Sequence, residues 1–191
     1  FVTTALLTWL SKYFQATLAL SEKSAGLKAS VVMLLAIVGA PLGGYISDQW
    51  RKKNVRARLL FPSITTGISA VLLFVAFTFT TGLTQYIVLL FFGITVTAFI
   101  PAAAAITQDV VHAGLRAVSY SIAVVIQNLL GASMAPVMIG VIMDATNVQT
   151  AMSILPAVLV AGAILFFLGS KYYIKDLAKV EKVELEADKP E

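Results

Sequence analysis

The charges of this chain are gathered in short islands between long apolar runs, and this pattern constrains the fold more than any other feature. No Asp, Glu, Lys or Arg lies between Ala29 and Ser47. Five of the ten residues after Asp48 are Lys or Arg, and none of these four residue types then occurs before Asp109. A helix that crosses the hydrocarbon of a bilayer needs about 20 apolar residues. The pattern therefore predicts an all-α membrane protein.

Composition supports this prediction and excludes other classes of protein. Of the 191 residues, 59% are hydrophobic and 13% are charged, whereas an ordinary soluble domain has roughly 25% charged residues. The net charge of +4 does not indicate nucleic-acid binding, because Lys and Arg cluster at the ends of apolar runs and not along one solvated face. The chain has no cysteine, which excludes disulfides and thiolate metal sites. We predict neither a cofactor nor a metal.

We predict six transmembrane helices within residues 1–173 and a charged cytoplasmic tail over 174–191. The run between Arg58 and Asp109 is too long for one span, and the Gly and Thr residues of 80–84 divide it. The predicted helices cover about 1–20, 29–48, 59–79, 85–108, 117–143 and 147–173. Because the first residue is Phe and not Met, we expect the chain to be a fragment or a cut domain.

The distribution of basic residues predicts the orientation of these helices. One set of helix ends, together with the tail, carries eleven Lys or Arg residues, and the opposite set carries three. Lys and Arg favour cytoplasmic loops, so the basic island at 48–58 and the C-terminus are predicted to face the cytoplasm. This anchoring alone would account for most of the positive charge of the island.

Asp48 and the glycines before it need a further explanation, which a repeated pattern supplies. The second predicted helix ends APLGGYISD and the fifth ends APVMIGVIMD, so that each has Ala-Pro and then a Gly four residues before a terminal Asp. The two acids, Asp48 and Asp144, are 96 residues apart. With three spans between them, the two copies end on opposite sides of the membrane. An inverted repeat of three plus three helices has this arrangement.

Six helices in a 3+3 inverted repeat, with Gly-x-x-x-Asp-x-x-x-basic-basic after the second, resemble one half of a major facilitator superfamily transporter. The family signature is roughly G-x-L-x-D-R-x-G-R-R, and the chain matches it at Gly44, Ile46, Asp48, Lys52 and Lys53. Gln49 and Arg51 depart from the signature, which is typical of the copy in the second half of such proteins. The stretch 108–147 is also similar to the eleventh helix of bacterial members, including spinster-like ones.

The resemblance implies that the chain supplies helices seven to twelve of a twelve-helix secondary transporter. Its partners would then be a missing N-terminal six-helix half, the lipid bilayer and a small-molecule solute, which moves by alternating access without covalent chemistry. The expected location is the plasma membrane, which is the inner membrane in bacteria. In this family the signature loop is a cytoplasmic gating motif, which in this chain consists of Gly44, Asp48, Arg51, Lys52 and Lys53.

The physics of helix ends bears on this motif. Asp48 ends a helix whose C-terminal dipole disfavours an anion, so it needs Lys or Arg, or a helix N-terminus across an interface. The resemblance implies that Asp48 pairs with a helix of the other half in one state and separates from it when the halves rock. Arg51, Lys52 and Lys53 could also bind anionic lipid headgroups. Topology anchoring alone is the alternative interpretation.

Polar side chains within the spans are candidates for the solute cavity, because polar groups in lipid are costly and usually face a cavity or a neighbouring helix. Gln127 and Asn128 are adjacent in the fifth helix, and Tyr120 shares a face with Gln127 by helical spacing. The resemblance adds the first helix, which lines the cavity in this family. The alternative for each residue is an interhelical hydrogen bond. The candidate cavity residues are Trp9, Tyr13, Gln15, Tyr120, Gln127 and Asn128.

Small residues and one proline predict how the helices pack. Gly39, Gly43 and Gly44 form a stripe along the second helix, which fits either close packing within the half or a sliding interface between halves. Pro136 lies within the fifth helix and should bend it.

Other functions were compared with transport. A stand-alone six-helix scaffold or sensor without transport activity is the alternative. An enzyme is not predicted, because the chain has one His, no Cys, no HExxH motif and no buried pair of acids. Lys12, the one cation inside a predicted span, either extends outward to water or attracts an anionic solute. A proton-coupling carboxylate would lie in the missing half, and sodium coupling or uniport fits these residues equally well.

Overall fold

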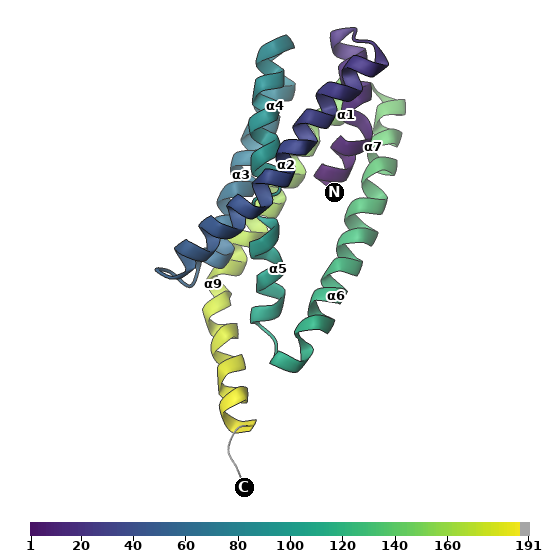
Figure 1. Cartoon of the computed structure of the whole chain (residues 1–191). Coiled ribbons are helices and arrows are strands. Elements are labelled where there is room, and N and C mark those ends of the chain that lie inside the picture. Colours follow the sequence, from purple (N-terminus) through teal and green to yellow (C-terminus); the bar gives the residue numbers. More distant parts are fainter. Residues whose placement is uncertain (188–191) are drawn as a thin grey trace.

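The computed structural model of the protein describes the backbone of residues 1–187 and the side chains of residues 1–180. All regular structure in this part of the chain is helical, which confirms that the protein is all-α. The long helices form an elongated bundle, and the end of α9 (Leu155–Ala187) projects beyond it (Figure 1). The end of the predicted tail, residues 188–191, lies outside the described residues.

Five helical segments of the described chain are long and apolar enough to cross a membrane, and the 17-residue helix α1 (Val2–Leu18) precedes them. In chain order they are α2 (Glu22–Arg51), α3 (Ala57–Thr78), α4 with α5 (Gly82–Val96 and Ile100–Asp109), α6 with η2 and α7 (Arg116–Ile126, Gln127–Ser133 and Met134–Ala145), and α8 with α9 (Val148–Ser153 and Leu155–Ala187).

Two helices extend beyond the apolar runs from which they were predicted. Helix α2 begins at Glu22 and not at 29, because Ser21 caps it by accepting a hydrogen bond from the Ser24 amide at 3.4 Å. Helix α9 continues past 173 to Ala187. Charged residues such as Lys and Glu sustain a helix as well as apolar ones do, so the ends of the apolar runs do not set the ends of these two helices.

The span at Gly82–Asp109 is broken between α4 and α5. The backbone makes short three-residue turns here, with hydrogen bonds from Ala98 to Thr95 at 3.2 Å and from Ile100 to Thr97 at 3.0 Å. Pro101 follows at once and has no N–H to donate to the Thr97 carbonyl. The proline thus explains why one predicted helix is two shorter ones.

The fifth span is continuous but contains a wide, π-helical stretch, η2, between α6 and α7. It lies immediately before Pro136, whose ring would collide with the Ala132 carbonyl in a regular α-helix. A wider turn relieves such a collision, and π-helical turns are a recognised cause of helix distortion. The predicted effect of Pro136 was a bend of this helix, and the distortion that the structure shows near it is a widened turn.

Helix α2 packs against α4 and α5 at unusually short range. A Cβ atom at Gly39 would meet the Ile94 carbonyl oxygen, and one at Gly43 would meet the Ala98 carbonyl oxygen. On the facing helix, a Cβ at Gly93 would meet the Val32 carbonyl oxygen. The glycine stripe of α2 therefore serves close packing within the bundle, which is one of the two interpretations left open by the sequence.

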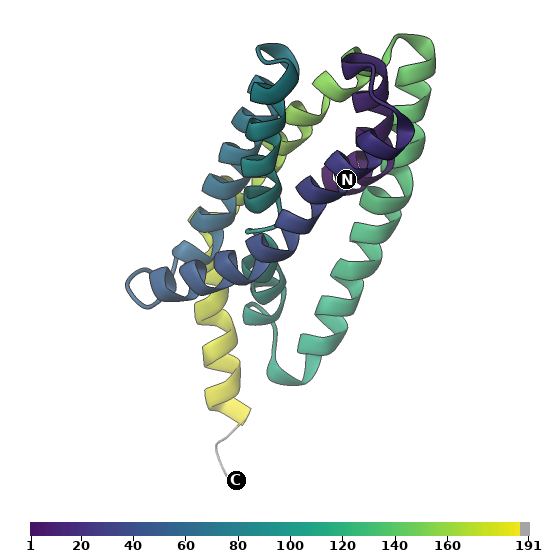
Figure 2. The ribbon, with the colours of Figure 1, turned by 45° about the horizontal axis from the view of Figure 1, so that its top comes forward.

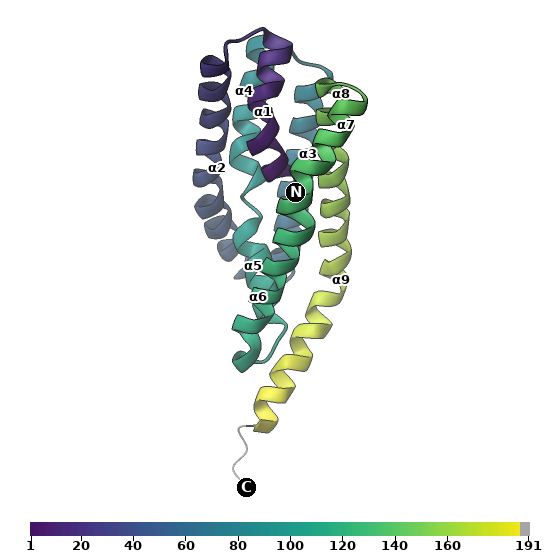
Figure 3. The ribbon, with the colours of Figure 1, turned by 90° about the vertical axis from the view of Figure 1, so that its right-hand side faces the viewer.

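The ends of the helices alternate between two ends of the bundle. Helices α2 and α5 end at the lower end in Figure 1, where α6 begins and α9 ends. Helix α7 ends at the opposite end, beside α8, as Figure 3 shows. Figure 3 shows α2 at one margin of the bundle, and Figure 2 shows the span of α6 and α7 at a margin. Helices α3 and α9 pack side by side.

The close approach of α2 predicts that Gly→Ala substitutions at two positions change the stability of the protein in opposite directions. Replacing Gly67 with Ala, in open packing on α3, should stabilise the protein by up to about 1 kcal/mol through helix propensity. Replacing Gly43 with Ala should destabilise it by at least about 1–3 kcal/mol, because the new methyl group meets backbone that cannot move aside. Thermal unfolding of the protein in detergent measures both. Equal shifts in melting temperature would contradict the packing described here.

Candidate functional site

Four charged side chains and one tyrosine join at the end of the bundle where α2 and α5 end. Arg58 donates from Nη1 to Asp48 Oδ1 at 2.6 Å and from Nε to Asp109 Oδ2 at 3.2 Å. Arg51 Nη2 lies 3.3 Å from the same Asp109 oxygen, and the Tyr173 hydroxyl donates to it at 2.7 Å. We call these five residues the charge network. It connects α2, α3, α5 and α9.

The centre of the charge network is the contact between Arg58 and Asp109. Their side chains are 12% and 20% exposed, whereas Asp48 is 63% exposed. Asp109 is the last residue of α5 and Arg58 lies in the first turn of α3, so each charge is at the helix end whose dipole disfavours it. Pairing removes both penalties, and charge-assisted hydrogen bonds of this kind are stronger than neutral ones.

The structure separates the predicted gating motif into two groups. Asp48 and Arg51 belong to the charge network. Gly44 instead packs against the ring of Pro101, which a Cβ would approach to 3.3 Å. Lys52 donates to Gln49 Oε1 at 3.1 Å on the exposed surface, and Lys53 is exposed beside it.

Sequence reasoning did not select Arg58, Asp109 or Tyr173 as members of this site. A signal for Asp109 was present, because it is the first charge after the long apolar run. Two spans separate it from the basic island, so both must lie on the same side of a membrane. Nothing in the sequence indicates that Tyr173, on the last helix, reaches them.

A second feature is a cavity of about 410 Å³ between α1, α5 and the α6–η2 helix. The predicted residues Tyr120 and Gln127 both line it, together with Val124 on the same helical face. Polar groups from the other walls include Thr4 and Thr107. The cavity therefore combines an apolar surface with a few hydrogen-bonding groups, as small-molecule sites usually do.

The remaining predicted cavity residues lie elsewhere. Tyr13 is buried in the core, where its hydroxyl accepts a hydrogen bond from Gln85 Nε2 at 2.7 Å. The Trp9 indole donates to the Pro136 carbonyl at 3.0 Å and so joins α1 to α7. Gln15 donates to Ser11 Oγ at 3.4 Å within α1. None of these three residues lines the cavity, since each is engaged by a neighbouring helix or by its own.

Asn128 follows Gln127 but does not line the cavity with it. Its side-chain amide donates to the Val124 carbonyl at 2.8 Å, one turn back along the same helix. Asn128 is exposed on the surface of the bundle.

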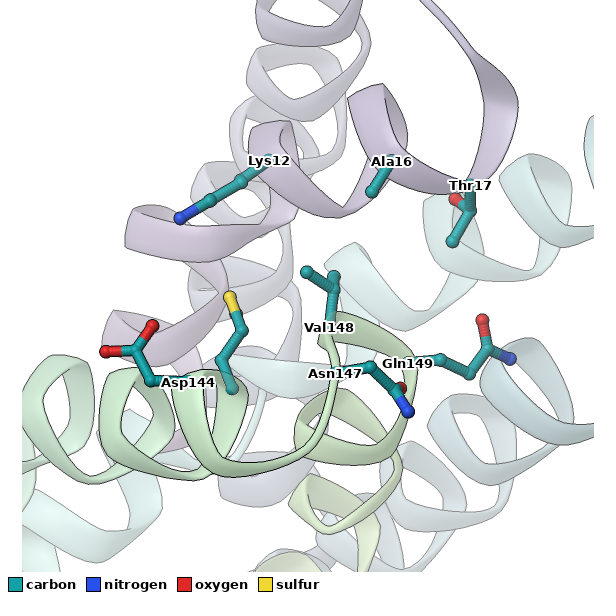
Figure 4. A pocket seen from close by; sticks show the side chains of 8 residues that line it. Lys12, Ala16, Thr17, Asp144, Asn147, Val148 and Gln149 are labelled. Atoms are coloured by element: carbon teal, nitrogen blue, oxygen red, sulfur yellow. The ribbon is translucent and has the colours of Figure 1, made fainter.

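An open pocket of about 540 Å³ lies at the end of the bundle opposite to the charge network (Figure 4). Lys12 of α1 and Asp144 of α7 both face it. The Lys12 ammonium lies 5.0 Å from the centre of the Trp9 ring, a cation–π arrangement. Among the described residues, no hydrogen bond or ion pair engages the Asp144 carboxylate. This end of the bundle therefore has opposite charges that are not paired.

Two comparisons with known proteins complete this description. The sequence profile of the Major Facilitator Superfamily matches residues 1–136. The uncharacterized transporter YybO of Bacillus subtilis (strain 168) is 27% identical over 183 residues, which cover 94% of this chain and 41% of that protein. The chain thus spans about two fifths of the length of this relative. Both matches confirm the resemblance indicated by the signature after the second helix.

The charge network yields a prediction about stability. Replacing Arg58 with Gln leaves Asp109 short of a partner in a site with little access to water. We expect a loss of about 1.5–3 kcal/mol in the free energy of unfolding, the range for hydrogen bonds to charged groups. Equilibrium unfolding in mixed detergent micelles measures this loss.

The matched control is Lys52→Gln, which removes an exposed cation of the same island. Substitutions of this kind usually change stability by less than about 0.5 kcal/mol. If both variants lose the same stability, the Arg58–Asp109 contact does not have the structural importance assigned to it.

Proposed function

The chain belongs to the major facilitator superfamily of transporters, and on that premise we propose that it is the C-terminal six-helix half of a secondary transporter. In this proposal it forms one wall of a central cavity and moves a small solute by alternating access with an N-terminal half. The bundle is an integral membrane protein, and its function is transport of a solute without covalent chemistry.

The observation that carries the proposal is the exposure of polar side chains in the middle of the fifth span. Gln127 and Asn128 are both exposed, although they lie near the centre of the span Ala113–Ala145. Contact of such groups with lipid hydrocarbon is costly, so in membrane proteins they face protein or a water-filled cavity. A solute cavity completed by a second half would provide that surrounding.

The burial of the five spans also supports a partner half, on the side of the bundle formed by the least buried helices. The spans Glu22–Arg51 and Ala113–Ala145 are the least buried of the five, whereas Ala57–Thr78 is the most buried. A partner half would cover these two helices. The length of the relative, of which the chain spans about two fifths, leaves room for another six helices.

The inverted repeat of three plus three helices is also part of the proposal. Its support is that the two Ala-Pro…Asp segments end α2 and α7 at opposite ends of the bundle (Figure 1). Inverted repeats place a solute site near the middle of the membrane, between elements that can rock against one another. The cavity beside η2 lies partway along the bundle, next to the widened turn of the fifth span.

Within this mechanism, Tyr120 and Gln127 would hydrogen-bond the solute, and Thr4 and Thr107 would add polar contacts from the other walls. Tyr13 is omitted, since it is buried in the core. Trp9 would act indirectly, because its hydrogen bond to Pro136 holds α1 against the irregular part of the fifth span.

The charge network would form the cytoplasmic side of the gate. Asp48 is exposed and, among the described residues, its carboxylate is bonded only by Arg58, so it can also reach a basic group or a helix N-terminus of the other half. In the proposal this contact forms when the cytoplasmic side closes. Arg51, Lys52 and Lys53 would also bind anionic lipid headgroups of the inner leaflet, and the last two are exposed. In the proposal the C-terminus is also cytoplasmic, because most Lys and Arg residues of the chain belong to this set of helix ends and to the tail.

Transport measurements test the cavity. A panel of small solutes is first screened for thermal stabilisation of the full-length protein, and a stabilising solute is then used in proteoliposome uptake. Gln127→Ala should reduce uptake by about 3- to 10-fold, the effect of one lost hydrogen bond. Leu129→Ala, on the exposed surface of the same helix, should leave uptake nearly unchanged. Equal losses in both variants would contradict the assignment of the cavity.

Labelling in whole cells tests the orientation. The chain has no cysteine. A single cysteine is introduced in place of Lys53 or Thr81 in a full-length protein that carries no other cysteine. Both residues are exposed, and they lie in loops at opposite ends of the bundle. A membrane-impermeant maleimide should label the cysteine at 81 in intact cells and the cysteine at 53 only after the membrane is opened. The reverse pattern would contradict the orientation.

A further inference from the structure

We infer that Tyr173 is a positioning residue, whose hydroxyl controls how Arg58 is shared between Asp48 and Asp109 and so controls the strength of the cytoplasmic gate. The inference rests on the proposed function, because it needs Asp48 to contact another half. It adds a residue from the last helix, α9, which contributes nothing to the cavity described above. It also assigns Tyr173 and Asp109 opposite effects on the gate.

The geometry shows that Arg58 is shared. Its single guanidinium contacts Asp48 through Nη1 at 2.6 Å and Asp109 through Nε at 3.2 Å. The shorter contact goes to the more exposed of the two acids, although burial strengthens an electrostatic attraction. Another donor that bonds the Asp109 carboxylate would explain why this carboxylate does not hold Arg58 alone.

Tyr173 is that group, together with Arg51. Its hydroxyl donates to Asp109 Oδ2 at 2.7 Å, the shortest contact that this oxygen makes in the charge network. Arg51 approaches the same oxygen at 3.3 Å and is itself 36% exposed. Tyr173 is only 2% exposed, and its backbone is held by the packing of α9 against α3. The hydroxyl is therefore a fixed donor, whereas Arg51 is a partly solvated one.

Removing this donor should move Arg58 toward Asp109. In Tyr173→Phe the partly buried Asp109 oxygen loses its shortest hydrogen bond, and the Arg58 guanidinium is already within reach of it. A buried carboxylate that loses a donor is costly, so the shared cation shifts to compensate. Asp48 is then less neutralised and attracts the positive group of the other half more strongly. The cytoplasmic side should close more often.

Removing the charge of Asp109 should have the opposite effect. In Asp109→Asn the side chain no longer competes for Arg58, and the guanidinium belongs to Asp48 alone. Asp48 is then more fully neutralised within its own half, and its contact across the interface weakens. The cytoplasmic side should open more often. A purely structural role would instead make both variants perturb the gate in the same direction, since each removes one contact of the same network.

The experiment measures access to the cavity from the cytoplasmic side in the full-length protein. A single cysteine replaces Ala104, which lines the cavity on α5, and an impermeant maleimide is added to inside-out vesicles. Labelling at this position should slow by about 3- to 10-fold in Tyr173→Phe and quicken by a similar factor in Asp109→Asn, as expected for the net effect of one ordinary hydrogen bond. Tyr172→Phe, an exposed neighbour on the same helix, should leave the rate unchanged.

Two further variants separate this inference from the proposed function. Asp48→Asn should quicken labelling, and adding Tyr173→Phe to it should change nothing more, because Tyr173 acts only through Asp48. If Asp48→Asn has no effect, the proposed gate is wrong and the inference falls with it. If Asp48→Asn acts as expected but Tyr173→Phe and Asp109→Asn shift the rate in the same direction, the gate stands and the role of Tyr173 is overturned.

Discussion

Helices in a membrane have no hydrophobic reason to prefer one another to lipid, so contacts other than apolar burial must hold this bundle together. The pairing of Arg58 with Asp109 is the contact on which one end depends. It joins the start of α3 to the end of α5, while Arg51 adds α2 and Tyr173 adds α9. Each charge is tolerated at its helix end only because the other is present. The same constraint explains why the charges of the chain occur in islands, since the apolar runs between them cannot contain any.

Away from the helix ends, close backbone contact takes the place of charge. Gly39 and Gly43 bring α2 against the backbone of α4 and α5, and Thr97 donates from its side chain to the Ala36 carbonyl across that contact. The break between α4 and α5 lies in this region. Pro101 lacks the N–H that would continue the helix there, and the glycines let α2 approach the carbonyls of Ile94 and Ala98. The irregular backbone is thus covered by a neighbouring helix, as it must be at membrane depth.

The sequence predicted the spans because the hydrocarbon thickness imposes a minimum length on uncharged runs. The extension of α2 back to Glu22 was missed, since charged residues end an apolar run without ending a helix. Arg58 and Asp109 are 51 residues apart in the sequence, and only the packed arrangement of α2, α3 and α5 brings them together. Tyr13 shows the converse difficulty, because a polar group in a span looks the same whether a solute or Gln85 satisfies it.

The two ends of the bundle differ in a way that bears on how it would move. Asp48 and Asp144 occupy matching places in the two repeated segments, yet the residue ten positions later is Arg58 in one copy and Ile154 in the other. The first acid is consequently tied into four helices, whereas the second faces an open pocket opposite Lys12 (Figure 4). In the described chain, α1 and α7 are instead joined deeper in the bundle, where the Trp9 indole meets the Pro136 carbonyl. That contact lies just beyond the widened turn of the fifth span. The bundle therefore has one end joined by charge across four helices, an opposite end that is open, and an irregular turn between them.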